Sequence, residues 1–113
     1  MAEYRKSIEQ NPRDLEAVNN LAWLLAACPD ASVRKPTEAI QLALQAVDHA
    51  TAASPVLLDT LATAHASAGD FKAAVKTANE ALQLAEESEA NELAIKIRQR
   101  LELYENHQPY LGP

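Results

Sequence analysis

The sequence has little of several features that other classes of protein require. It holds one cysteine in 113 residues, Cys28, so its fold cannot depend on an internal disulfide or on an oxidising compartment. Only 4% of the residues are aromatic and only two are glycine, whereas alanine and leucine are abundant, which favours close-packed helices over a β-sheet. No apolar run approaches the roughly 20 residues that cross a bilayer. We expect a soluble domain without membrane contact, compatible with the cytoplasm but with its compartment undetermined.

Positive charge is also scarce. Ten lysines and arginines stand against 16 aspartates and glutamates, for a net charge of -6. This excess would repel a phosphate backbone, and no basic stripe with interleaved aromatic residues offsets it. We therefore expect no nucleic-acid partner, and the acidic balance favours a neutral or basic segment on any protein partner.

The most regular stretch runs from residue 58 to residue 82 and predicts two amphipathic helices joined by a tight turn. Apolar and small residues recur at three- and four-residue steps on both sides of Gly69-Asp70. Gly69 can take a positive φ and end the first helix, and Asp70 can cap the second. The stripes contain many alanines, which let helix axes approach to about 8 Å. The unit is a helical hairpin.

This hairpin resembles the tetratricopeptide repeat (TPR), whose pattern is W-x2-L-G-x2-Y followed by A-x3-F and A. The resemblance is carried by Leu58-x2-Leu61-Ala62-x2-His65, then Gly69-Asp70-Phe71, then Ala74-x3-Ala78-x2-Ala81. Leu58, Ala62, His65 and Ala78 depart from the pattern, mostly by a change of size within a packed position. The resemblance implies an all-α fold of antiparallel helical hairpins, stacked as a right-handed superhelix that holds another protein.

The whole chain, residues 1–113, reads as a single TPR-like domain. We expect the end of a truncated repeat at 2–12, a repeat with a long inner loop at 14–53, a second repeat at 54–86, a capping helix at 88–106 and an irregular tail at 107–113. A chain that starts inside a repeat suggests a piece excised from a longer protein; the alternative is a natural short capping helix. The runs at 21–29 and 97–110 together resemble a C-terminal form of TPR module found in bacterial proteins.

Two segments connect or cover these repeats. The loop 28–35 carries a small basic spot, Arg34-Lys35, which we interpret as part of a solvated connector; contact with an acidic partner is the alternative. In the capping helix, apolar residues form one stripe, and four charged residues are predicted to lie off it: Lys96, Arg100, Glu102 and Glu105.

Residues suited to catalysis or metal binding do not form a recognisable pattern. The three histidines, His49, His65 and His107, have no second histidine or cysteine three to five residues away. His65 lies on an inward stripe and is expected to be a core residue. A phosphate loop and a nucleophile elbow are absent from the sequence. We expect a protein that is not an enzyme and that needs no metal or cofactor.

Trp23 is the one residue that the core pattern leaves unexplained. It points roughly 150° away from the centre of the stripe on its own helix. In the resembled family, first-helix positions of this kind line a concave groove that receives peptides. The corresponding residues here are Asn19, Asn20, Trp23, Ala26, Asp59, Thr63 and Ala66. None is basic, which disfavours the carboxylate-clamp type of the family, because that type grips its ligand with groove lysines and arginines.

Two functions remain open at this point. The first is a protein-interaction module that binds a peptide or protein segment in the groove, with Trp23 as its anchor. The second is structural, a homodimer or a spacer within a larger protein, with Trp23 packed against the helix at 2–10 or against another copy. Fewer than three complete repeats is marginal for this architecture, which makes self-association reasonable.

Overall fold

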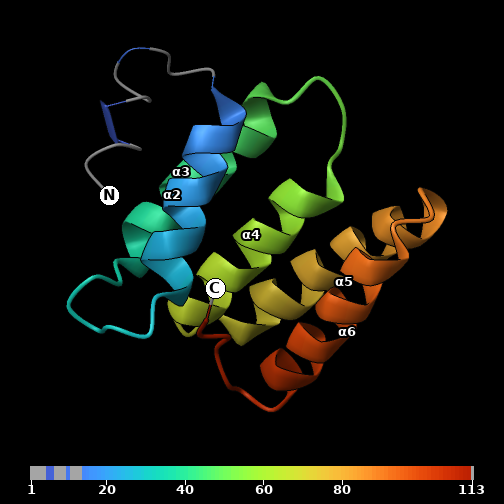
Figure 1. Cartoon of the computed structure of the whole chain (residues 1–113). Helices are drawn as coiled ribbons and strands as arrows, with labels where there is room; N and C mark the ends of the chain where they lie inside the picture. The colour runs from blue at the N-terminus through green and yellow to red at the C-terminus, as the bar shows by residue number, and fades with distance from the viewer. Residues whose placement is uncertain (1–4, 7–9, 11–13, 113) are drawn as a thin grey trace.

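The described part of the computed structural model, residues 5, 6, 10 and 14–112, contains α-helices and no strands. In chain order the labelled helices are α2 (Leu15–Ala27), α3 (Pro36–His49), α4 (Pro55–Ser67), α5 (Phe71–Glu87) and α6 (Asn91–Glu105) (Figure 1). None of these helices combines the length and the apolar character that a bilayer span requires. The predicted all-α class is confirmed, while most of the expected N-terminal repeat end at 2–12 lies outside the described residues.

Local residues mark where each helix of the first hairpin begins. The Asp14 side chain accepts a hydrogen bond from the Ala17 backbone N–H at 3.2 Å, which satisfies one of the donors left free at a helix start. Pro36 is the first residue of α3, where its fixed φ is suitable and its missing N–H costs nothing. The helices α2 and α3 pack against each other along their length.

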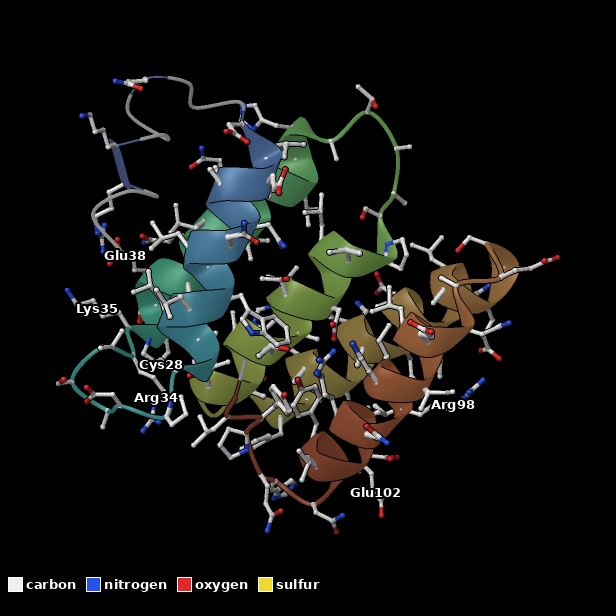
Figure 2. All side chains as sticks on the ribbon, in the orientation of Figure 1. Cys28, Arg34, Lys35, Glu38, Arg98 and Glu102 are labelled. Carbon is white, nitrogen blue, oxygen red and sulfur yellow. The ribbon has the colours of Figure 1, made fainter. Side chains whose placement is uncertain are left out.

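The long loop between them folds back on α2. The Arg34 guanidinium donates to the backbone oxygen of Cys28 at 2.9 Å and to that of Pro29 at 3.3 Å (Figure 2). A cation at this place complements the partial negative charge of a helix C-terminus. The expected connector is thus held by its own arginine, which is engaged with the loop backbone.

The second hairpin, α4 and α5, follows the predicted turn chemistry. Gly69 has φ +84°, and the Asp70 side chain accepts from the Ala73 N–H at 3.1 Å. At the other end, α5 stops at Glu87 and the chain turns sharply into α6. Glu89 takes φ +59° there, and the Ala90 N–H reaches back to the Ala85 carbonyl at 2.8 Å. The helix α5 therefore ends in a turn and does not continue into α6.

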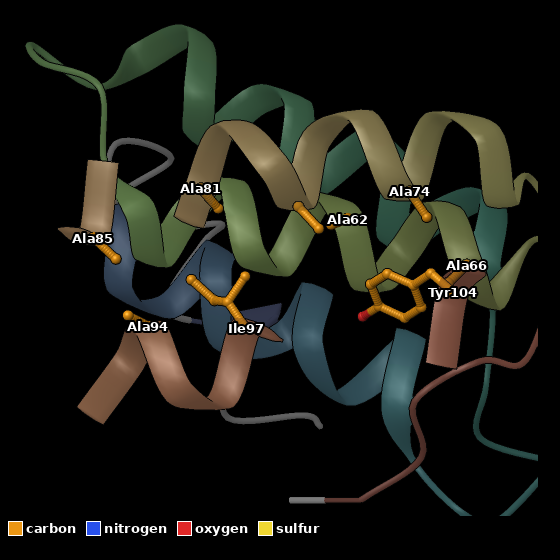
Figure 3. Packing of buried hydrophobic residues seen from close by; sticks show 9 residues of the cluster. Ala62, Ala66, Ala74, Ala81, Ala85, Ala94, Ile97 and Tyr104 are labelled. Carbon is orange, nitrogen blue, oxygen red and sulfur yellow. The ribbon is translucent and has the colours of Figure 1, made fainter. Parts of the chain in front are cut away.

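Alanine dominates the core, which lies mainly between α4, α5 and α6 (Figure 3). Ala62, Ala74, Ala78 and Ala81 have no exposed surface, and the larger Ile97 and Tyr104 of α6 close the cluster. Because a methyl side chain takes little room, neighbouring axes can come close without a cavity. Besides packing on α5, α4 also contacts α2, α3 and α6. The helix α4 is therefore in contact with both α2 and α6.

One prediction about the capping helix is wrong. Arg100, expected off the buried stripe, is only 8% exposed. It lies on the side of α6 that meets α4, because α6 contacts α4 as well as α5. A single stripe describes a helix with one neighbour, whereas α6 has two.

Candidate functional site

Three helices contribute to one surface: α2, α4 and α6. They carry Trp23, Asp59 and Arg100 respectively, and these three side chains meet. Although 41 residues separate Asp59 from Arg100, the contacts of α4 with both α2 and α6 bring them together. We expected α2 and α4 to be the first helices of two repeats and α6 to be the capping helix. All three present side chains to the same face of the molecule.

Asp59 and Arg100 form a buried ion pair. The Arg100 Nη1 donates to the Asp59 Oδ2 at 2.5 Å, and the two side chains are 10% and 7% exposed. Burial raises the pKa of the Asp59 carboxyl to about 6, although the positive charges of Arg100 and Lys96 oppose this shift. The cost of removing the carboxylate from water thus exceeds the gain from its partner, as often happens with buried pairs.

Arg100 also contacts two aromatic rings that lie side by side. Its guanidinium carbon is 4.7 Å from the centroid of the Trp23 ring and 4.7 Å from that of the Tyr110 ring. The two rings are 5.7 Å apart and tilted by 51°. Cation–π contacts of this kind are worth about 0.5–2 kcal/mol each, more when they are desolvated. Trp23 therefore packs against α6 and the tail, a neighbourhood that neither reading of the sequence included.

The tail reaches this site from the end of α6. It crosses to the C-terminal end of α2 (Figure 1), where the Gly112 N–H donates to the Ala27 carbonyl at 2.8 Å. Gly112 has φ +149°, and a Cβ there would lie 3.1 Å from the Tyr110 hydroxyl oxygen. Both the backbone angle and the close approach favour glycine. The described part of the tail lacks regular secondary structure, as expected, but it is held at Tyr110, which contacts Arg100, and at Gly112, which bonds Ala27.

Beneath the ion pair is a second polar contact. The Thr63 hydroxyl donates to the Asp59 carbonyl at 2.9 Å and lies 3.0 Å from the Tyr104 hydroxyl. Since the Thr63 proton is used toward Asp59, the Tyr104 hydroxyl is the donor in the second bond. Burial raises the pKa of Tyr104 to about 12, so it stays protonated and able to donate. This bond ties α6 to α4 from inside the core.

Next to these contacts lies an open hollow of about 570 Å³ between α2, α4 and the tail. Its walls combine apolar surface with amide, hydroxyl and carboxylate groups: Asn19, Asn20, Trp23, Leu24, Cys28, Pro29, Val56, Asp59, Thr60 and Gly112. Within the described residues, the Oδ1 atoms of Asn19 and Asp59 are buried without a hydrogen-bond partner. Among the same residues the Arg100 Nε, a donor, is also buried without a partner, so the unpaired groups behind this face are of both kinds, and none of the three atoms is exposed to the hollow.

The structure places the seven predicted groove residues in two groups. Asn19, Asn20, Trp23 and Asp59 line the hollow together. Ala26, Thr63 and Ala66 are at most 1% exposed: Ala26 packs with Leu21 and Leu25, Thr63 bonds Tyr104, and Ala66 belongs to the cluster around Ile97. The chain itself covers their positions, so the open part of the face is shorter than the sequence suggested.

Sequence reasoning missed three contributors to the site: Arg100, Tyr110 and Gly112. One signal pointed to the first. Asp59 was assigned to the concave groove, and an acid that the covering helix removes from solvent requires a cationic partner, which Arg100 of that helix can supply. No comparable signal pointed to the tail, because irregular segments have no periodicity that reveals where they dock.

The histidines lie apart from this site. His49 and His107 are exposed, and His65 is half-buried, with its pKa lowered chiefly by burial. His107 stacks on Phe71 at 5.4 Å between ring centroids. Within the described residues, no three histidine, cysteine, aspartate or glutamate side chains are grouped so that they could hold a metal ion.

Comparisons with known proteins returned no matching family model, no matching curated protein and no matching solved structure. Any functional conclusion therefore rests on the residues and geometry of this chain.

Proposed function

We propose that this chain is a protein-interaction module with a TPR-like, right-handed arrangement of helical hairpins, of the C-terminal type that resembles bacterial modules. It binds an extended, neutral or basic segment of a partner protein in the hollow between α2, α4 and the tail. The proposal includes no catalytic step and no cofactor.

The observation that carries it is the composition of the hollow. Its volume of about 570 Å³ falls within the range of ligand sites, and its walls are mainly apolar with a few convergent polar groups. A tryptophan at its edge offers a large aromatic surface of the kind that anchors bound proteins. Such a mixture fits a peptide, which presents apolar side chains and backbone N–H groups together.

Charge and hydrogen bonding narrow the class of partner. The chain carries a net charge of -6, and side chains that can accept hydrogen bonds, those of Asn20, Asp59 and Thr60, are among the residues that line the hollow. A segment that brings N–H donors or positive charge complements both features, while an acidic segment would be repelled. Since α2 and α4 are already packed, binding would require little backbone movement.

The test uses the exposed rim of the hollow. Displayed random peptides of 12 residues are selected on the wild-type chain and then measured by calorimetry against Val56→Lys and Ile95→Lys. Val56 lines the hollow and is 48% exposed, whereas Ile95 is 53% exposed on α6 and outside it. We expect Val56→Lys to weaken binding about tenfold or more, equivalent to about 1.4 kcal/mol, and Ile95→Lys to leave it nearly unchanged.

Two results would contradict the proposal. Selected peptides whose binding is insensitive to Val56→Lys would place the binding surface elsewhere. A wild-type dimer in sedimentation that Val56→Lys converts to a monomer would make the hollow an interface between copies, in agreement with the structural alternative.

A further inference from the structure

We propose that the tail segment Pro109–Gly112 is an internal ligand of this face, and that the partner segment competes with it by presenting an aromatic residue followed, two positions later, by glycine. This inference rests on the proposed function and specifies its ligand. It commits to a segment of another protein as the competitor.

The tail is held as a bound peptide would be. It follows the end of α6, where His107 takes φ +56° and the Gln108 N–H returns to the Leu103 carbonyl at 2.9 Å. Beyond that turn, the Tyr110 side chain packs on Arg100, on Trp23 and on the edge of the cluster between α4, α5 and α6, and the Gly112 N–H donates to α2. A side-chain anchor combined with main-chain hydrogen bonding is the usual basis of peptide recognition.

The contacts of each tail residue define what a competitor needs. The Tyr110 ring fills a slot formed by the Trp23 ring and the Arg100 guanidinium, so an aromatic ring is required there. Leu111 is 44% exposed, so its position places little demand on the side chain. At Gly112 any Cβ would approach the tyrosine hydroxyl, so glycine is favoured. The recognised pattern is therefore aromatic-x-Gly in an extended segment.

Two features make displacement possible. The Ala27 carbonyl that accepts from Gly112 lies at the C-terminal end of α2, where carbonyls have no partner within the helix, so any backbone N–H can replace that of the tail. Gly112 also lines the open hollow, so a segment bound in the hollow lies next to the tail and can extend into its place. Because the tail is tethered, its effective concentration is in the millimolar range, and a partner must overcome it.

The experiment keeps the full chain and empties the slot with Tyr110→Ala. The probe is the amidated hexapeptide His-Gln-Pro-Tyr-Leu-Gly, which reproduces residues 107–112. Trp23 is the only tryptophan, so its fluorescence reports directly on the slot. We expect the hexapeptide to bind Tyr110→Ala at least about tenfold more tightly than wild type, since the tethered competitor has been weakened. It should also restore the wild-type emission of Trp23.

Two controls accompany this measurement. A hexapeptide with alanine in place of tyrosine should not bind, and Leu111→Ala, which changes an exposed side chain of the same tail, should behave as wild type. The proposal is overturned if folded Tyr110→Ala does not bind the hexapeptide, if wild type binds it equally well, or if Leu111→Ala opens the slot to the same extent. Loss of helical circular dichroism in Tyr110→Ala also overturns it, because Tyr110 would then be a core residue and not a displaceable ligand.

The outcome is separable from that of the proposed function. If the hexapeptide fails while peptides selected on the wild-type chain still depend on Val56, the tail is structural and the hollow remains the binding site. If the binding of the selected peptides is also independent of Val56, both proposals are wrong.

Discussion

Asp59 in α4 and Arg100 in α6 are joined by a hydrogen bond of 2.5 Å between charged groups that are almost entirely removed from solvent. The pair links the covering helix to the second hairpin, and the arginine extends the link to Trp23 of the first. This connection places α6 and the Tyr110 ring of the tail against the first hairpin.

Removing the arginine should destabilise the chain strongly. In Arg100→Met the Asp59 carboxyl loses its cation while it remains buried, and we expect the free energy of unfolding to fall by about 3 kcal/mol. Urea denaturation followed by circular dichroism measures the change. The double variant Asp59→Leu with Arg100→Met removes both charges, so it should be more stable than the sum of the two single losses implies. Additive losses would mean that the pair is not coupled.

The raised pKa of Asp59 predicts a definite pH dependence. A carboxyl whose pKa is about 6 when folded and 3.8 when unfolded binds its proton more readily in the folded state between these values. Its contribution to stability is therefore largest at low pH and decreases as the pH rises from about 4 to 6. Between pH 7 and pH 5, wild type should gain about 1 kcal/mol relative to Asp59→Asn, in which this group is absent.

Urea denaturation of both proteins at the two pH values tests this sign, and the comparison cancels groups that titrate alike in both. A wild-type chain that loses stability relative to Asp59→Asn on acidification would mean that the ion pair outweighs burial. The pKa of Asp59 would then be lowered.

The hydrogen bond between Thr63 and Tyr104 predicts which of two substitutions lowers the free energy of unfolding more. In Thr63→Val the Tyr104 hydroxyl keeps its proton but loses its acceptor inside the core, which should cost about 1–3 kcal/mol. In Tyr104→Phe the Thr63 hydroxyl still donates to the Asp59 carbonyl, so the loss should be smaller. Thermal unfolding of both variants and of the double variant measures the order. A larger loss for Tyr104→Phe would reverse the assignment of donor and acceptor.

Substitutions of Gly69 test the predicted turn between α4 and α5. A Cβ at this position would meet no heavy atom within 4 Å, so the cost of Gly69→Ala comes from φ +84° alone. We expect a loss of about 1 kcal/mol in the free energy of unfolding and a smaller loss for Gly69→Asn, since asparagine tolerates this region better. Equal stability of the alanine variant would show that the turn relaxes to a negative φ.

Local chemistry made the helices and their limits predictable. Asp70 caps the helix that it was expected to cap, and Gly69 closes α4 as expected. Asp14 likewise caps α2, and Pro36 and Pro55 open α3 and α4. Each of these signals acts within four residues along the chain, so it can be read without a partner element. The alanine-rich stripes likewise identified the buried faces of the second hairpin. The right-handed superhelix stays a proposal.

The site itself could be predicted only in part. The helical period showed that Trp23 points away from its own stripe, and Asn19, Asn20, Trp23 and Asp59 do lie together beside the hollow. The same period could not show how far α6 would cover this face. Thr63 and Ala66 pack with residues of α6, whereas Ala26 is buried among residues of α2, α3 and α4. Arg100 is buried although the stripe placed it outside.

The helices, their caps, their turns and the acidic balance depend on composition or on interactions between near neighbours, so they can be predicted from the order of residues. The pairing of Arg100 with Asp59, the contacts of Arg100 with Trp23 and Tyr110, and the hydrogen bond from Gly112 to Ala27 depend on how the helices pack. Several of these contacts join distant residues: Asp59 and Arg100 are 41 positions apart, and Trp23 and Tyr110 are 87 apart (110 − 23). Their formation depends on how whole helices pack, which no local pattern of side chains encodes.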